Sequence, residues 1–151
     1  MGVKTGARAH VRARREARIL ALQVLYETDT AQHPAGEVLQ RHLHERADGA
    51  DGGARQYAIQ LVSGVLQDRA ALDAVLSDCA PDFPLADLSP IDRNVLRIGL
   101  YEIHAGLAPV KVAVNEAIEI AKQFGSDTSP RFVNGVLGNA ASRLRPSGGA
   151  A

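Results

Sequence analysis

The chain has 151 residues, of which 46% are apolar and 23% charged, with a formal net charge of zero, one cysteine and no tryptophan. The single cysteine, Cys79, excludes an intramolecular disulfide and a cysteine-based metal site. No apolar run approaches the roughly 20 residues that a membrane span needs. The N-terminus is basic but lacks the apolar stretch of a secretory signal, so we expect a cytoplasmic protein.

Positive charge is concentrated at the N-terminus. The first 18 residues contain six basic residues and one acid, Glu16, whereas the rest of the chain contains 11 basic and 16 acidic residues. A basic arm on an acidic body indicates a polyanionic partner for the arm, and a basic protein partner for the body is also consistent with it.

The first half of the chain has helical patterns separated by a glycine-rich connector. We expect residues 1–7 to be loose and a helix to begin between Arg8 and Arg12 and to end near Thr28. The patterns that follow are a short helix over 36–46, a connector over 47–54 and one long helix over 54–79. Together they predict an N-terminal helical half, residues 1–80, that carries the basic arm.

Prolines and glycines divide the second half. The PDFP sequence at residues 81–84 ends the long helix, and Ser89-Pro90 is typical of a helix start. That helix runs to about His104, the next from Pro109 to Gly125, and the last from Pro130 to about Leu144. The C-terminal half is therefore residues 81–145, with a disordered tail over 146–151. The pattern predicts an all-α protein of six main helices, divided near residues 81–84 into these two halves.

The arginines of the arm have helical spacing. Arg8, Arg12, Arg15 and Arg18 are four and three residues apart, so they can share one stripe of a helix. A basic stripe is often only a solvated surface. Arginine, however, forms bidentate bonds to phosphate and stacks on bases, which favours RNA as the partner.

Phe132 lies beside Arg131 at the start of the last helix. On a helical projection Phe132 falls at the edge of the apolar stripe and Arg131 falls outside it. Two interpretations stay open. Phe132 is either a peripheral core residue that covers the helix start or a platform on which a base stacks. Under the second interpretation, free backbone N–H groups at the helix start add affinity for anions.

Three segments carry a resemblance to a known family: ARREARILALQVLYE, SPIDRNVLRIGLYEI and VAVNEAIEIAKQFGSDTSPRFVNGVL. Over about residues 12–145 the chain resembles the NusB family of bacterial transcription antitermination factors. The resemblance implies an all-α fold of two small packed helical bundles with about six to seven helices. It implies binding to the boxA element of ribosomal RNA leader transcripts together with NusE, a ribosomal small-subunit protein. It also implies assembly with other Nus factors on RNA polymerase, without catalysis and without a cofactor.

The resemblance also implies site residues. The arginine-rich start of the family's first helix corresponds to Arg12, Arg14, Arg15 and Arg18, and its basic–aromatic pair corresponds to Arg131 and Phe132. Lys4 and Arg8 lie outside the matched segment and extend this RNA surface. The NusE surface corresponds to Tyr26, Glu27 and Asp92. Two departures bear on individual contacts, because Glu16 interrupts the basic run and Pro130 stiffens the helix start.

The sequence also bears on two other classes of function, an enzyme and a protein-interaction module. The chain has no phosphate-binding loop, no dinucleotide fingerprint, no nucleophile elbow and no HExxH metal motif, so we do not expect an enzyme or a metal site. A homodimeric protein-interaction module with its RNA surface masked stays open as the alternative.

Overall fold

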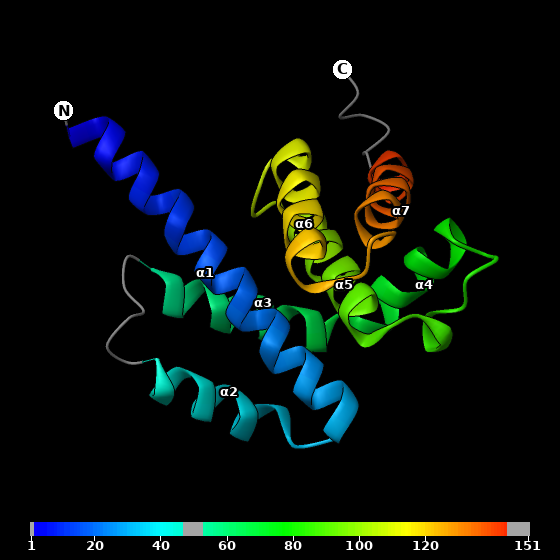
Figure 1. Ribbon diagram of the computed structural model, residues 1–151, viewed down its shortest axis with the longest axis horizontal. Coiled ribbons are helices and arrows are strands. Elements are labelled where there is room, and N and C mark those ends of the chain that lie inside the picture. The colour runs from blue at the N-terminus through cyan, green and yellow to red at the C-terminus, as the bar shows by residue number, and fades with distance from the viewer. Residues whose placement is uncertain (1, 47–52, 145–151) are drawn as a thin grey trace. The chain divides into compact units, whose positions relative to one another are not determined.

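The computed structural model describes residues 2–46 and 53–144, with side chains from residue 6 onward. These residues form seven α-helices, one short 3-10 helix and no strand, which confirms the all-α prediction (Figure 1). The helices are α1 (Gly2–Ala31), α2 (Ala35–Glu45), α3 (Ala54–Gln67), α4 (Arg69–Cys79), η1 (Leu85–Asp87), α5 (Pro90–His104), α6 (Val110–Phe124) and α7 (Ser129–Leu144). The expected tail over 146–151 and most of the expected connector lie outside the described residues.

Contacts within the chain group it into two compact units, residues 1–64 and residues 65–151, with the boundary inside α3. The sequence places its division at the prolines of residues 81–84 instead. Prolines mark where a helix must end, whereas a unit is defined by where contacts are dense. A division into stable halves at residue 80 therefore stays a prediction.

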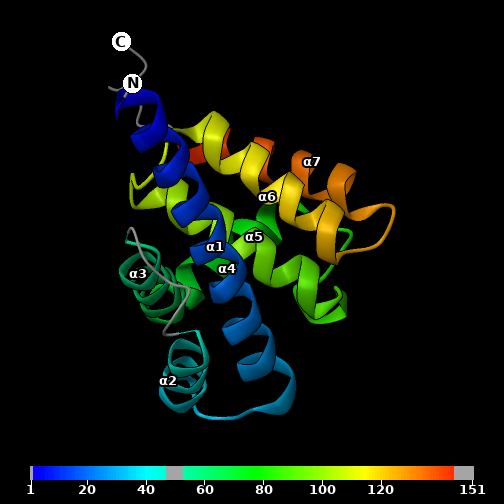
Figure 2. The same ribbon diagram turned by 60° about the vertical axis from the view of Figure 1, so that its left-hand side comes forward.

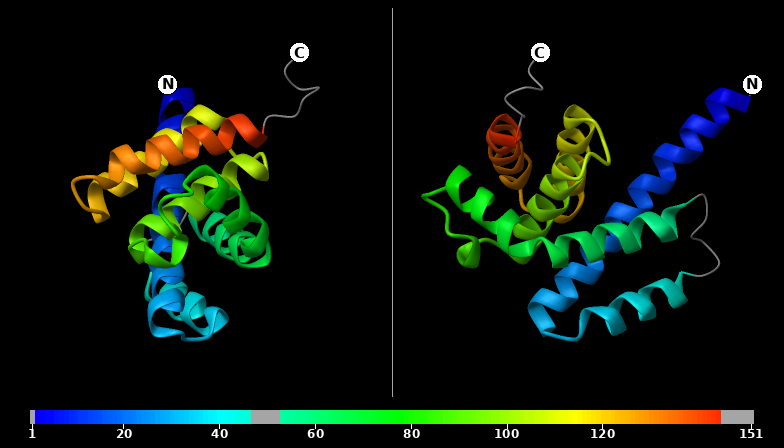
Figure 3. Two further views of the ribbon diagram at one scale, coloured as in Figure 1. Left: turned by 90° about the vertical axis from the view of Figure 1, so that its right-hand side faces the viewer. Right: turned by 180° about the vertical axis from the view of Figure 1, so that it is seen from behind.

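Unit 1 is built on the long helix α1. This helix begins at Gly2, so the expectation of a loose segment over residues 1–7 is wrong. Alanine and arginine have high helix propensity and outweigh the two glycines that suggested a loose start. Gln32, in the left-handed region at φ 57°, ends α1, and α2 then folds back from the C-terminal end of α1 and packs on it (Figure 3). The core of this unit consists of aliphatic side chains from α1, α2 and α3, among them Leu22, Leu43 and Leu61.

The long helix expected over residues 54–79 is two helices, α3 and α4, so that expectation is wrong. Asp68 separates them with φ −97° and ψ 11°, and its carbonyl accepts the first hydrogen bond of α4 from the Leu72 N–H at 2.9 Å. Buried apolar residues continue at helical spacing on both sides of the break, including Val65 and Leu72. Hydrophobic periodicity therefore gave no sign of it.

Unit 2 is arranged around α5, which contacts α4, α6 and α7. Figure 2 shows α6 and α7 side by side over α5. Helix α5 begins as the sequence predicts, with the Ser89 hydroxyl accepting the Asp92 N–H at 3.1 Å and Pro90 in the first turn. At Gly99 an added Cβ would lie 2.8 Å from Leu137 of α7, so the missing side chain allows α5 and α7 to approach closely.

An ion pair between a buried arginine and a half-buried aspartate, which the sequence pattern did not predict, joins α5 to α4. Arg97 is nearly fully buried and donates from Nε and Nη2 to the two carboxylate oxygens of Asp73, at 2.8 and 3.0 Å. Its Nη1 donates to the Asn94 side chain at 3.2 Å. This bidentate geometry satisfies a buried guanidinium, and we assign Arg97 to the stability of unit 2.

Candidate nucleic-acid interface

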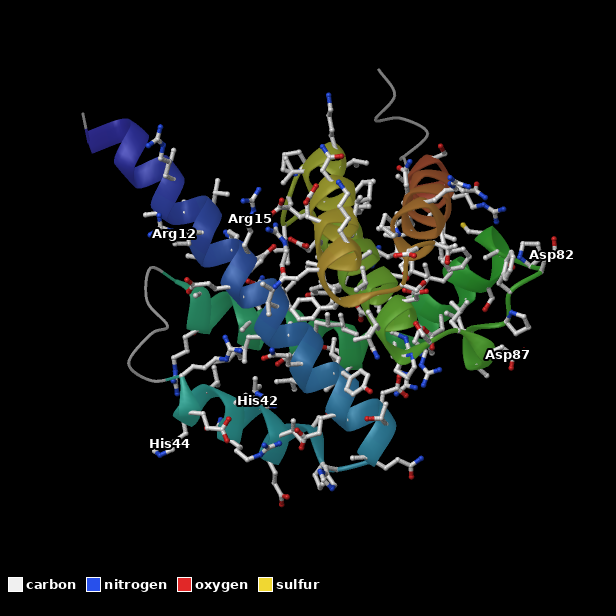
Figure 4. All side chains as sticks on the ribbon, in the orientation of Figure 1. Arg12, Arg15, His42, His44, Asp82 and Asp87 are labelled. Carbon is white, nitrogen blue, oxygen red and sulfur yellow. The ribbon has the colours of Figure 1, made fainter. Side chains whose placement is uncertain are left out.

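The arginines of α1 fall into two groups. Arg8, Arg12 and Arg15 are exposed, and Figure 4 shows Arg12 and Arg15 on the N-terminal half of the helix. Arg14 is half-buried and Arg18 is only 3% exposed. The four-residue stripe from Arg8 to Arg18 therefore does not present four equivalent guanidinium groups to solvent. The side chain of Lys4 lies outside the described residues.

Contacts with Tyr57 of α3 explain why Arg14 and Arg18 are less exposed to solvent than the other arginines. The guanidinium carbon of Arg14 lies 3.6 Å from the centre of the Tyr57 ring, and that of Arg18 lies 5.8 Å from it. Both distances are within the range of cation–π attraction. Tyr57 is 5% exposed, so its contacts with these two arginines join α1 to α3 inside unit 1.

The sequence held one sign of this arrangement. Arg18 precedes Leu22 by four residues and Leu25 by seven, and both leucines are buried. Residues at these spacings share a helix face, so Arg18 belongs to the core-facing side of α1. No sequence pattern indicates Tyr57, because only the folded chain brings it against α1.

The start of α7 holds the second predicted cluster. Arg131 is exposed and Phe132 is half-buried. The Phe132 ring packs against Phe83, with ring centres 5.4 Å apart and an angle of 71° between the planes, an edge-to-face arrangement. Phe83 is 54% exposed and lies in the PDFP sequence, whose pattern predicts only the end of a helix.

The backbone at the start of α7 offers less to an anion than the sequence suggested. The Ser129 N–H donates to the Ser126 carbonyl at 3.1 Å, and the Phe132 N–H donates to the Thr128 carbonyl at 3.1 Å. Pro130 has no N–H to offer. Among residues 129–132 only the Arg131 amide remains for a ligand, so the first turn of α7 offers fewer free donors than the second interpretation supposes.

The three residues predicted for NusE differ in their surroundings. Tyr26 is 41% exposed. The Glu27 carboxylate accepts a hydrogen bond from Arg41 and lies 3.1 Å from His33 Nδ1 and 3.4 Å from His42 Nε2. The Arg41 bond is the largest cause that holds the pKa of Glu27 at about 2, below its ordinary 4.5.

Asp92, the third of these residues, lies in the first turn of α5. Its Oδ1 atom is buried and has no hydrogen-bond partner among the described residues. An unmatched buried acceptor costs free energy, and a donor from a partner would recover it.

Other kinds of site find little support in the described residues. No group of three His, Cys, Asp or Glu side chains among them is placed to hold a metal ion. Within the same residues, no helix has both the length and the apolar character required to cross a bilayer. Cys79 is buried, and burial raises the pKa of its thiol, which makes it unreactive.

Comparison with known proteins identifies the family. The sequence profile of the NusB family matches residues 15–142. The transcription antitermination protein NusB of Roseiflexus castenholzii (strain DSM 13941 / HLO8) is 40% identical over 135 residues, which cover 87% of this chain and 94% of that protein.

Solved structures agree with this match. The structure of T. maritima NusB superposes with a TM-score of 0.82 at 30% identity, covering 91% of this chain and 96% of that one. A crystal structure of antitermination factors NusB and NusE in complex with dsRNA shares the fold, with a TM-score of 0.79 at 24% identity over 87% of this chain and 98% of that one. The helical architecture, the arginine-rich first helix and these matches lead to one conclusion: the chain belongs to the NusB family.

Proposed function

We propose that this protein is an RNA-binding transcription antitermination factor that binds boxA RNA of ribosomal RNA leader transcripts together with NusE. The observation that carries the proposal is the run of exposed arginines on α1, Arg8, Arg12 and Arg15, in a chain of the NusB family. A NusB crystallised with NusE and dsRNA supports both partners. In this proposal the complex acts in the cytoplasm with other Nus factors on RNA polymerase.

The arginines of α1 have two roles in this proposal. Arg8, Arg12 and Arg15 contact phosphates directly, because their guanidinium groups reach solvent. Arg14 and Arg18 hold the helix against Tyr57 and contribute positive field more than direct contacts. RNA affinity should therefore depend on salt through the first group, and the stability of unit 1 should depend on the second.

The start of α7 contributes the contact to bases. Arg131 supplies a charged group for phosphate and Phe132 supplies an aromatic ring. Stacking on aromatic side chains is sequence-tolerant and contributes about 1–3 kcal/mol per base. In this proposal α1 contributes mainly phosphate contacts to RNA affinity and α7 contributes base stacking. A substitution in one helix should therefore remove one contribution and leave the other.

The NusE contact rests on Tyr26, Glu27 and Asp92. Tyr26 offers an exposed ring with a hydroxyl, the pairing of apolar body and polar tip that protein interfaces favour. Asp92 offers a buried acceptor without a partner in the described chain. The Glu27 carboxylate already accepts a hydrogen bond from Arg41, so in this proposal it presents a fixed negative charge to NusE next to Tyr26.

NusB-family proteins are not enzymes, so membership of the family confirms the prediction that the chain is not one.

The alternative function, a homodimeric interaction module with its RNA surface masked, differs from the proposed one in the oligomeric state of the free protein. In that case the free protein is a dimer and the arginines of α1 become available only when it separates.

The proposal is tested by fluorescence anisotropy with labelled boxA RNA and a scrambled RNA of the same composition, each with and without NusE. We expect weak binding of boxA by the protein alone, tighter binding when NusE is present, and weaker binding of the scrambled RNA in both cases. Equal affinity for the two RNAs under all conditions would contradict boxA recognition. Light scattering on the free protein separates monomer from dimer and so tests the alternative.

A further inference from the structure

The loop between α4 and α5 presents an aromatic ring that the family assignment does not explain. Phe83 is 54% exposed, more than any other large apolar side chain among the described residues. Exposing a phenylalanine ring costs free energy unless something covers it. Its backbone is constrained, because prolines precede and follow it at residues 81 and 84 and its N–H donates to the Ala80 carbonyl at 3.0 Å. The backbone that carries the ring is therefore constrained before any partner arrives.

Phe83 and Phe132 form a pair that leaves aromatic surface open. In an edge-to-face arrangement each ring covers only part of the other, and here the centres are 5.4 Å apart with planes at 71°. The end of α4, from which this loop leaves, is also bonded to α7. Asn139 donates to the Cys79 carbonyl at 3.4 Å, and Arg143 donates to the Asp78 carbonyl at 3.1 Å. Both rings thus belong to one part of unit 2.

The charges around the pair distinguish between occupants. Arg131 adjoins Phe132 in sequence and is exposed. Asp82 directly precedes Phe83 and Asp87 follows it by four residues, and Figure 4 shows their carboxylates pointing outward. Phosphate is attracted by Arg131 and repelled by the carboxylates. The face of an uncharged base is nearly indifferent to both. A strand of RNA can therefore keep its backbone at Arg131 and place a base at Phe83.

We propose that Phe83 is a second stacking ring for a nucleobase of single-stranded RNA, next to Phe132. This inference rests on the proposed RNA-binding function and adds to it a residue in a loop far from Phe132 in sequence. The bound chemistry is a flat, uncharged base face, and the phosphate that follows it lies toward Arg131. A basic protein segment is the competing occupant, which Asp82 and Asp87 would attract.

The first experiment measures the affinity of single-stranded boxA RNA for the parent protein, Phe83→Ala, Phe83→Leu and a control, Val112→Ala. Val112 is 44% exposed on α6 of the same unit, so the control removes a comparable exposed apolar group. Loss of one stacked base predicts a weakening of about 5- to 160-fold for Phe83→Ala and Phe83→Leu, with an unchanged dependence on salt. Val112→Ala should bind as the parent does. Phe83→Leu keeps an apolar side chain but has no ring, so it tests the need for the aromatic ring if Phe83→Ala fails to fold.

A second experiment reports stacking directly. The chain has no tryptophan, so Phe83→Trp introduces a single fluorescent reporter. We expect this variant to bind RNA at least as tightly as the parent, and its emission to be quenched when a base stacks on the indole ring. Asp82→Asn should strengthen binding at low salt, because it removes a charge that repels phosphate.

The outcomes separate the two proposals. If the parent binds no RNA with or without NusE, the proposed function fails. If the parent binds and Phe132→Ala weakens binding while Phe83→Ala and Phe83→Leu do not, the role of Phe83 is refuted and the function stands. Loss of NusE binding by Phe83→Ala with RNA affinity intact would assign the ring to a protein partner and would also overturn this inference.

Discussion

Replacing one exposed and one buried arginine of α1 separates RNA binding from stability. Arg12 is exposed, so Arg12→Ala should weaken binding to every RNA and leave the free energy of unfolding within about 0.5 kcal/mol of the parent. Arg18 is 3% exposed and lies near the Tyr57 ring. Arg18→Ala should lower the free energy of unfolding by about 2–3 kcal/mol, because it removes a buried side chain and its cation–π contact.

The size of the binding effect follows from the number of exposed arginines. If Arg8, Arg12 and Arg15 each neutralise one phosphate of a single strand, they contribute a slope of about −2 in log affinity against log salt. Raising salt from about 50 to 200 mM then costs roughly 20-fold in affinity through these contacts, and only roughly 7-fold once one arginine is removed. The change of slope is the diagnostic quantity, since a misfolded variant would lose affinity at every salt concentration alike.

Anisotropy titrations across this salt range, with urea unfolding followed by circular dichroism, measure both quantities on the same proteins. Arg55→Ala is a matched control, because Arg55 is exposed on α3 outside the arginine run of α1 and should keep the slope of the parent. The reasoning is refuted if Arg12→Ala keeps the parent's slope while Arg18→Ala flattens it with an unchanged free energy of unfolding.

Three further predictions concern stability. Arg97→Ala should lower the free energy of unfolding by about 2–4 kcal/mol, because it removes a buried side chain and its two hydrogen bonds to the half-buried Asp73. A coupling energy below about 0.5 kcal/mol between Arg97 and Asp73 in a double-mutant cycle would argue against this. Glu27 has a folded-state pKa of about 2 against an ordinary 4.5, so its bond to Arg41 should stabilise the protein above pH 4.5 and lose that effect as the pH falls through 2. Unfolding curves of the parent and of Glu27→Gln should therefore converge toward pH 2, and a constant difference from pH 2 to 6 would exclude this account. Gln32→Gly should raise the free energy of unfolding by about 0.5–1 kcal/mol, because a φ of 57° strains glutamine and not glycine, and a lower thermal midpoint for the variant would count against it.

Local signals predicted most of the helices. Ser89-Pro90, Pro109 and Pro130 each mark a helix start that the structure places within one residue. These signals work because capping and the geometry of proline act within one turn of the chain. The break at Asp68 was missed for the same reason, since nothing in the neighbouring residues requires it and apolar spacing continues across it.

The candidate site was predicted only in part, because exposure depends on residues distant in sequence. Phe132 could be placed at the edge of its helix from spacing alone. That Phe83 meets its ring could not, because 48 residues separate the two and the turn between α4 and α5 decides the contact. The PDFP sequence did contain a signal. Its prolines are enough to end a helix, so the aromatic residue between them indicates a further role.

Counting charge overestimates what α1 can offer to RNA. The sequence places five arginines between residues 8 and 18, yet Arg14 and Arg18 turn toward Tyr57 of α3. A helix returns to the same face every three to four residues, so a run of arginines longer than one turn must serve two neighbours once another helix packs beside it. Arginine suits contacts both to RNA and to a packed helix, because its planar guanidinium group binds phosphate and stacks on aromatic rings. Lysine stacks on rings poorly. Arg14, half-buried between these roles, is therefore the residue at which RNA affinity and the stability of unit 1 should fall together when it is changed to alanine.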